Sequence, residues 1–270
     1  MSLTQTLSTV GLIRPSRRRG FCPACRFLFA APAGEHRGGA VELAPPAFAA
    51  LAFLVVAAIA WGLVVRESRS GGDMEMGLGS FESFTASWVV MMAAMMLPSA
   101  MPLVFEFARS AEGRRGWQAA TGMLGATYLS VWLAFGIACY LLISALPMSW
   151  TDDRLADGLA LALAGLYALS PLKRASEARC RELCALHGPL PFNLMRSAVV
   201  VGANYGLSCV GCSAALMVAM VLVGMSSLVW VAILCGIVLV YKLAPAPSMW
   251  QTLILSAALG GLGVVYVFGV

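Results

Sequence analysis

The sequence predicts an all-α fold, a polytopic transmembrane helical bundle of about seven spans. Of its 270 residues, 60% are hydrophobic and only 11% are charged, and the mean hydropathy is +0.84. A soluble domain has about 25% charged residues, so this composition indicates that much of the apolar surface faces lipid. The net charge of +5 is modest and fits arginines in loops. We therefore expect the membrane to be a partner and nucleic acid not to be one.

Seven apolar runs approach the length of about 20 residues that a helix needs to cross the hydrocarbon. The fourth and sixth are short, and the third is long enough to be tilted or kinked. We interpret residues 1–46 as a poorly ordered cytoplasmic tail and residues 47–270 as the transmembrane domain, because the short apolar stretch in the tail is too interrupted for a signal peptide. The runs cover residues 47–65, 84–105, 118–146, 155–171, 203–224, 227–243 and 249–269.

Lysine and arginine are distributed unevenly among the segments that connect these runs. Fifteen of the 18 lie in the tail and in alternate connecting segments, and only three lie in the others. Such residues are enriched on the cytoplasmic side of a membrane. The pattern therefore predicts a multi-pass protein of the inner (plasma) membrane, with its N-terminus inside and its C-terminus outside.

The second apolar run carries a cluster of methionines. Five of the chain's 15 methionines lie within eleven residues of this run. At about 100° per residue, four of them fall within about 140° of one another on a helix. Pro98 and Pro102 follow, and each removes a backbone donor, so we expect a kink and carbonyls released at Ala94 and Pro98. The four methionines are Met91, Met92, Met95 and Met96.

The fifth run presents a second face of soft sulfur atoms. Cys209, Cys212, Met217 and Met220 fall within about 140° of one another on a helical wheel. Thioethers and thiolates bind soft ions such as Cu(I) in preference to hard ones. Both clusters also have a simpler interpretation, because methionine fills gaps in apolar cores and buried cysteine packs as a small hydrophobic residue.

Two further groups in the predicted cytoplasmic segments contain metal-ligand types. Cys22 and Cys25 form a Cys-x-x-Cys pair in the tail, and Cys180, Cys184 and His187 follow the fourth run. Together they could form one zinc or copper site. Reduced thiols without a metal are the alternative.

Two segments combine the sulfur residues with a fixed set of neighbours. They are Trp88-x-x-Met91-x-x-Ala94-Met95-Met96-x-Pro98-x-x-x-Pro102 and Gly206-Leu-x-Cys209-x-Gly-Cys212-x-x-x-Leu216-Met217. These segments resemble the bacterial family described as predicted metal-binding integral membrane proteins (domain of unknown function 2182). The resemblance covers about residues 80–245, and Leu172-Lys173 with Cys180-Arg181 is similar to the cytoplasmic loop of that family. It implies a membrane protein that binds a metal.

The chain departs from that family at three positions. Ser213 and Ala214 stand where a second cysteine and a tryptophan typically follow the cysteine pair, and Ser176 stands where a loop cysteine is expected. Fewer sulfur atoms imply a weaker or altered site.

The leading hypothesis is an integral membrane protein that binds a soft metal ion between the second and fifth runs for metal handling or transport. The sequence leaves open whether the protein is an enzyme and favours that it is not. We expect copper rather than zinc, because thioethers bind Cu(I) without losing a proton, which suits a site of low dielectric constant. The predicted ligands are Met91, Met92, Met95, Met96, Cys209, Cys212, Met217 and Met220.

Two alternatives remain open. Cys209 and Cys212 could pass electrons in a membrane thiol–disulfide oxidoreductase, with Cys22 and Cys25 as a cytosolic relay. The chain could also be a structural membrane subunit without a site of its own.

Overall fold

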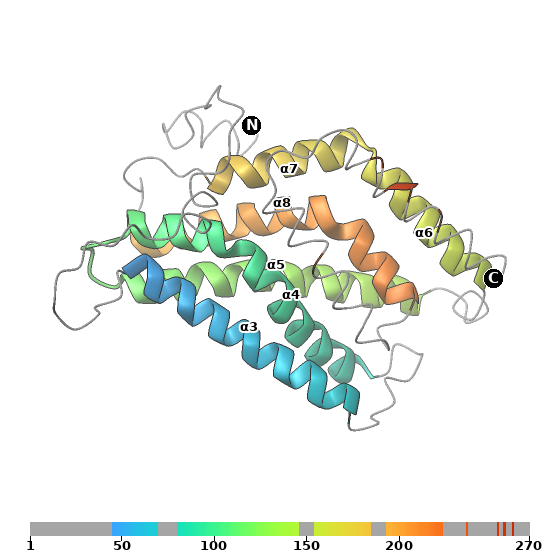
Figure 1. Ribbon diagram of the computed structural model, residues 1–270, viewed down its shortest axis with the longest axis horizontal. Helices are drawn as coiled ribbons and strands as arrows, with labels where there is room; N and C mark the ends of the chain where they lie inside the picture. The colour runs from blue at the N-terminus through green and yellow to red at the C-terminus, as the bar shows by residue number, and fades with distance from the viewer. Residues whose placement is uncertain are drawn as a thin grey trace.

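The computed structural model describes residues 45–69, 80–145, 154–184 and 193–223, with a few positions between 236 and 261 (Figure 1). All regular structure in these ranges is helical, which confirms the all-α class for the described part of the chain. The predicted tail up to residue 44, residues 185–192 and nearly all of the sixth and seventh apolar runs lie outside it. The helices are α3 (Pro45–Arg69), α4 (Phe81–Ser110), α5 (Trp117–Ser144), α6 (Arg154–Ala168), α7 (Pro171–Cys184) and α8 (Leu194–Val223).

Four of these helices are long and apolar enough to cross a membrane, namely α3, α4, α5 and the greater part of α8. They correspond to the first, second, third and fifth apolar runs of the sequence. The fourth run becomes α6, whose 15 residues extend about 22 Å, less than the hydrocarbon thickness of about 30 Å. The count of seven spans and the orientation of the termini stay predictions.

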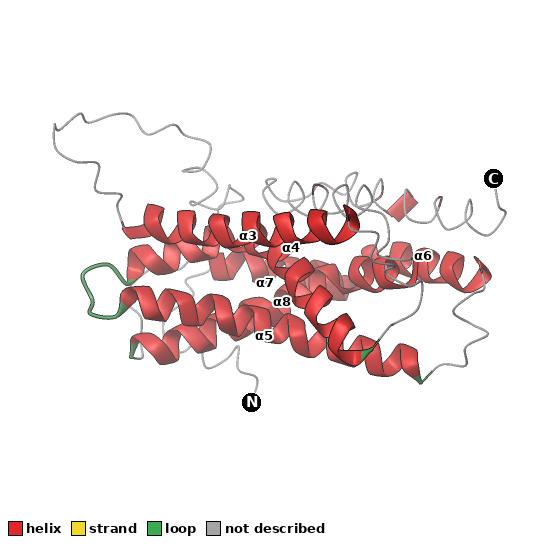
Figure 2. Cartoon of the chain, turned by 90° about the horizontal axis from the view of Figure 1, so that it is seen from below, coloured by secondary structure: helices red, strands yellow, loops and turns green. Residues whose placement is uncertain are grey.

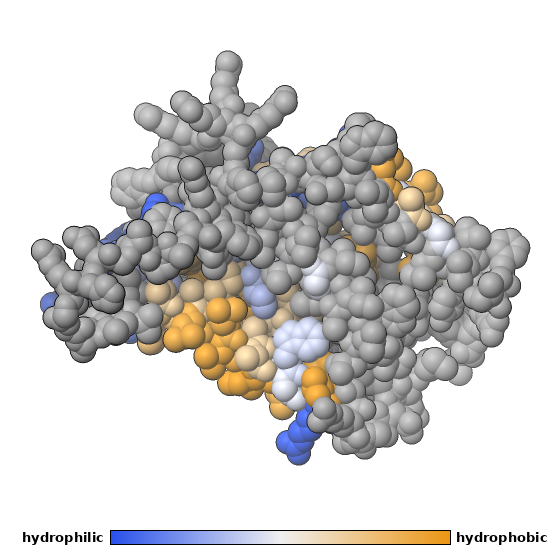
Figure 3. Space-filling view, in the orientation of Figure 1, coloured by the Kyte–Doolittle hydropathy of each residue, from blue (hydrophilic) through white to orange (hydrophobic). Residues whose placement is uncertain are grey.

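The central helix of the bundle is α4, which packs against both α3 and α5. In the most apolar 18-residue stretch of α4, 78% of the residues are buried, compared with 17% in the corresponding stretch of α3. A helix that is apolar on all sides is stable only when other helices or lipid surround it. In contrast, α3 exposes Leu51, Val55 and Ile59, and Figure 3 shows the hydrophobic face at the position of α3. This face is suited to contact with lipid.

The ends of α4 are set by local sequence. The Ser80 hydroxyl accepts a hydrogen bond of 3.2 Å from the Ser83 amide, which caps the first turn. The helix continues through Pro98 and Pro102, and it bends along its length (Figure 1), as expected for internal prolines. The turn to α5 contains Gly113 and Gly116, at φ of 77° and 80°, a region that favours glycine.

Helices α6 and α7 form an arm that lies along α8, and both pack against it (Figures 1 and 2). The helical chain is interrupted at Ser170, whose hydroxyl accepts a hydrogen bond of 3.2 Å from the Lys173 amide, with Pro171 in the first turn of α7. At Gly211 of α8, an added methyl group would collide with the Ser176 side chain of α7. The glycine therefore lets α7 approach α8 closely.

Helix α8 begins at Leu194, although the apolar run that predicts it begins only at residue 203. The Asn193 side chain accepts a hydrogen bond of 2.9 Å from the Arg196 amide and starts the helix. The segment expected to be a cytoplasmic loop is largely helical, because α7 occupies it before residue 185 and the first turns of α8 occupy it after residue 193. These two helices pack against each other.

Candidate metal centre

The methionines of α4 lie in the interior of the bundle. Met92 and Met95 are each 1% exposed, Met96 is 0% exposed and Met91 is 6% exposed. Their side chains belong to a continuous cluster of buried residues. Burial of this kind suits both apolar packing and soft-metal binding, so the neighbours of these methionines decide between the two.

The sulfur residues of α8 belong to the same cluster. Cys209 and Met217 are 0% exposed, and Cys212 is 9% exposed. Seven of the eight ligands expected from the sequence are therefore members of one buried group. Met220 is a residue of α8, but its side chain lies outside the described residues.

Helix α5 lies against both sulfur-bearing helices. It packs closely on α4 and on α8, whereas the backbones of α4 and α8 are not a closely packed pair. The sequence led us to expect a metal site between these two helices. Two tyrosine side chains, Tyr128 and Tyr205, make polar contacts that connect α4 with α8.

Tyr128 of α5 joins the two sulfur clusters. Its hydroxyl donates to the Met96 carbonyl at 3.5 Å and lies 3.1 Å from the Cys209 sulfur. A phenol has one proton, so donation to Met96 leaves the oxygen to accept from the Cys209 thiol. Tyr128 is 1% exposed, so these contacts are screened from water.

Tyr205 of α8 makes a second link to α4. Its hydroxyl donates to the Ser99 carbonyl at 3.2 Å, and the Ser99 hydroxyl donates to the Met96 carbonyl at 2.8 Å. The sequence predicted that prolines would release the carbonyls of Ala94 and Pro98. The carbonyls bound by the tyrosines are those of Met96 and Ser99, in the same proline-containing stretch of the helix.

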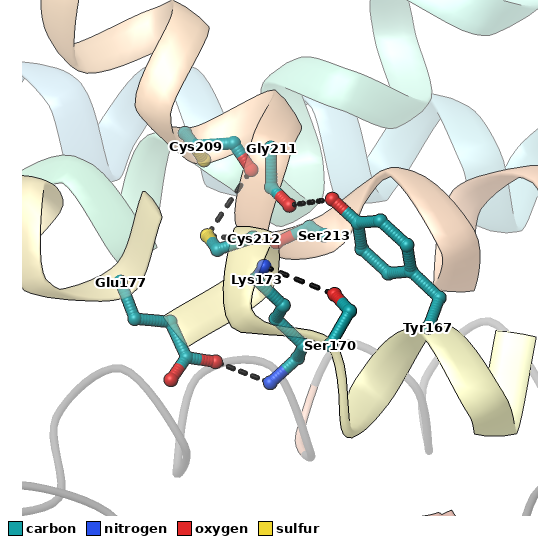
Figure 4. A network of polar contacts seen from close by, with 8 residues as sticks. All are labelled: Tyr167, Ser170, Lys173, Glu177, Cys209, Gly211, Cys212 and Ser213. Atoms are coloured by element: carbon teal, nitrogen blue, oxygen red, sulfur yellow. Dashed lines mark hydrogen bonds and ion pairs between the residues drawn. The ribbon is translucent and has the colours of Figure 1, made fainter. Parts of the chain in front are cut away.

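The two sulfur atoms of the Cys-x-x-Cys pair have different hydrogen-bond partners. The Cys212 thiol donates to the Cys209 carbonyl at 3.1 Å (Figure 4). The Cys209 sulfur contacts the Tyr128 hydroxyl. All five described cysteines are thiols, not disulfides. Within the described ranges, no group of three or more histidine, cysteine, aspartate or glutamate side chains is arranged to hold a metal ion. A soft ion held by three or more side chains of this cluster would therefore need methionine among its ligands.

A buried ion pair lies on α7, the helix that covers the cysteine pair. The Lys173 ammonium donates to the Glu177 carboxylate, and the two side chains are 4% and 12% exposed. Pairing of the opposite charges makes the burial of Lys173 and Glu177 tolerable.

A second polar contact joins α6 to α8. The Tyr167 hydroxyl of α6 donates to the Gly211 carbonyl, between the two cysteines in sequence (Figure 4). The arm formed by α6 and α7 is thus attached to the cysteine-bearing turn of α8 by a polar contact.

Cys180 and Cys184 also belong to the main buried cluster. They are 8% and 6% exposed, on the face of α7 that packs into the bundle. Tyr205 and Cys209 of α8 belong to the same cluster, and α7 packs on α8. The sequence grouped this pair with Cys22, Cys25 and His187, which lie outside the described residues.

Sequence reasoning missed Tyr128 and the Lys173–Glu177 pair. The available signal for Tyr128 was a phenol within an otherwise apolar run, because a buried tyrosine hydroxyl usually finds a hydrogen-bond partner. For Lys173 and Glu177 the signal was their spacing of four residues, which places opposite charges together on a helix.

The fold and this cluster define a helical protein with membrane-length helices and a buried group of soft sulfur donors. The sequence matches the PpoB2 family, described as a copper chaperone, over residues 85–266. The match covers more than half of the chain, which therefore belongs to this family. The match indicates a metal-related family and names copper. No curated protein and no solved structure matches the chain.

Proposed function

We propose that the protein binds Cu(I) within the membrane, at the buried cluster shared by α4 and α8, and delivers the ion to an acceptor. The observation that carries this proposal is the position of Tyr128, which contacts the Met96 carbonyl and the Cys209 thiol. The expected ligand set is the one predicted from the sequence, Met91, Met92, Met95, Met96, Cys209, Cys212, Met217 and Met220.

The chemistry of these donors favours Cu(I) over harder ions. Thioether and thiolate sulfur select soft ions, and a monovalent ion loses less hydration energy on burial than a divalent one. One thiolate would neutralise the charge of the ion. When Cys209 gives up its proton, the Tyr128 hydroxyl can turn its own proton from the Met96 carbonyl toward the thiolate. Copper is the cargo here, so a chaperone role requires release as well as binding.

The direct test is Cu(I) titration of the purified full chain in detergent, against a chromogenic Cu(I) chelator. The Met95→Leu/Met96→Leu and Cys209→Ser/Cys212→Ser variants should each lose the same bound ion. Met123→Leu and Cys139→Ser are matched controls on α5, since Met123 is 41% exposed and Cys139 lies outside the main buried cluster. Unchanged binding in both site variants would refute the proposal.

The same variants distinguish the alternatives. A dithiol redox couple that disappears only in the cysteine variant, without Cu(I) binding in any protein, would favour a thiol–disulfide oxidoreductase. If the protein shows no copper binding and no redox couple, the results favour a structural subunit. The Cys209 sulfur contacts Tyr128 and the Cys212 thiol donates to a backbone carbonyl, so these contacts do not favour the oxidoreductase.

A further inference from the structure

The cysteines of α7 occupy the buried face of a helix that is otherwise strongly charged. Arg174, Arg179 and Glu182 are exposed, whereas Cys180 and Cys184 are 8% and 6% exposed. Residues four apart lie on adjacent turns of one face, with Cβ atoms about 5–6 Å apart. The sequence of α7 thus turns two thiols together into the bundle and these three charges outward.

Tyr205 places this pair beside the proposed membrane site. Tyr205 shares one buried cluster with both α7 cysteines and with Cys209, and its hydroxyl donates to the Ser99 carbonyl of α4. Helix α7 packs on α8 and also contacts α4, so groups of the three helices lie together in this cluster. The α7 thiols are neighbours of the sulfur cluster in space, although they follow a different apolar run in the sequence.

The charges of α7 determine which end of the cluster the pair occupies. Charged side chains are costly in hydrocarbon, so the exposed face of α7 belongs at or beyond the aqueous boundary. The methionines of α4 belong to a helix of membrane length and composition. The Cys180–Cys184 pair consequently lies at the water-facing end of the cluster, and Met92, Met95 and Met96 lie toward its membrane end.

We propose that Cys180 and Cys184 form a second Cu(I) site, which exchanges the ion with the membrane cluster. This inference rests on the proposed function and adds the route by which the ion reaches or leaves water. Two thiolates satisfy Cu(I), which accepts two-coordinate geometry, whereas structural zinc sites require four ligands.

The exchange is a substitution of ligands without a change of oxidation state. As the bonds from copper to the Cys209 sulfur and to the methionine thioethers break, bonds to the Cys180 and Cys184 sulfurs form. The protons that leave Cys180 and Cys184 go to water, and Cys209 takes up one proton. Copper remains Cu(I) throughout, so no oxidant or reductant is needed.

The experiment measures the number of Cu(I) ions bound per chain in full-length protein that carries Cys22→Ser/Cys25→Ser, which removes the tail thiols. This parent protein is compared with variants that carry further substitutions. Adding Cys180→Ser/Cys184→Ser should lower the bound copper by one ion per chain and leave the ion that Met95→Leu/Met96→Leu removes. The matched control is Cys139→Ser, which replaces a buried thiol of α5 outside the main cluster and should lose no copper. An α7 variant that binds as much copper as its parent overturns the inference.

Two further results separate this inference from its alternatives. If Cys22→Ser/Cys25→Ser alone already abolishes the second ion, the α7 pair is one half of a site shared with the tail and the inference is wrong. If the proposed function is wrong, the result is different, because Met95→Leu/Met96→Leu and Cys209→Ser/Cys212→Ser would then bind as much copper as the unmodified protein.

A spectroscopic measurement avoids any dependence on the folding of the serine variants. X-ray absorption of the Cys22→Ser/Cys25→Ser protein should show the signature of two-coordinate Cu(I) with sulfur ligands when the second ion is added. A second ion without that signature contradicts the proposed pair.

Discussion

The Tyr128 hydroxyl oxygen lies 3.1 Å from the Cys209 sulfur, and both side chains are buried. The same hydroxyl reaches the Met96 carbonyl on a third helix. A phenol is both a donor and an acceptor, so it can serve either a thiol or a thiolate. In the proposed function, Tyr128 is a positioning residue whose hydrogen bonds would change when Cys209 exchanges its proton for a metal ion.

Replacement of Tyr128 by phenylalanine should remove this contact and preserve the packing of the ring. We expect the free energy of unfolding to fall by about 1 kcal/mol, the net contribution of a typical hydrogen bond. Affinity for Cu(I) should fall about tenfold, because a hydrogen bond to a charged thiolate is stronger. Thermal unfolding and chelator competition measure the two effects.

Tyr140→Phe is the control for that change, because Tyr140 is on the same helix and packs against Phe84. It should leave copper affinity unchanged. Equal copper affinities for Tyr128→Phe and the unmodified protein would show that the hydroxyl does not support the bound state.

The contact between α7 and α8 is sensitive to one methyl group. Gly211→Ala should destabilise the protein by about 1–3 kcal/mol, because the added carbon collides with Ser176 and overpacks the interface. It should also release the copper ion assigned to Cys180 and Cys184. Thermal unfolding and copper stoichiometry are the measurements.

Gly122→Ala is the matched control, since an added methyl group there meets nothing within 4 Å. Alanine is favoured over glycine in a helix by about 1 kcal/mol, so this variant should be as stable as the parent or more so. Adding Ser176→Gly to Gly211→Ala should restore stability. If the two alanine variants unfold alike, close packing at Gly211 is not important.

Replacing one partner of the Lys173–Glu177 pair should lower the unfolding free energy more than replacing both partners. Lys173→Met leaves a carboxylate that is only 12% exposed without its ammonium partner, and we expect a loss of about 3 kcal/mol in unfolding free energy. Lys173→Met/Glu177→Leu should recover much of that loss, because no uncompensated charge remains. Denaturant or thermal unfolding in one detergent measures both, and a double variant no more stable than the single one contradicts this account.

The side of the membrane on which α7 lies can be tested by labelling. The predicted orientation places α7 and the α4–α5 turn on the cytoplasmic side. Arg179→Cys and Arg115→Cys replace exposed residues of these two segments. A membrane-impermeant maleimide should modify both in inside-out vesicles and neither in intact spheroplasts, with the labelled peptides identified by mass spectrometry. Labelling of the two from opposite sides would exclude the predicted topology.

Much of the helical architecture follows from local sequence. The runs at 47–65, 84–105, 118–146 and 203–224 correspond to α3, α4, α5 and α8 because length and hydropathy are properties of a single segment. The burial of the α4 methionines does not follow from hydropathy alone, since α3 is more apolar than α4 and is mostly exposed. The sequence predicted the ends of helices less accurately, because capping by Asn193 extends α8 beyond its apolar run.

The sequence by itself determined an all-helical chain with membrane-length helices and two helices rich in soft sulfur. Only the tertiary structure decided that Tyr128 connects Met96 to Cys209, and that α7 buries Cys180 and Cys184 in the same cluster as Tyr205. Helical periodicity specifies which residues share a face of one helix. Which faces meet depends on the shapes of two helices together, such as the close approach that Gly211 allows to Ser176.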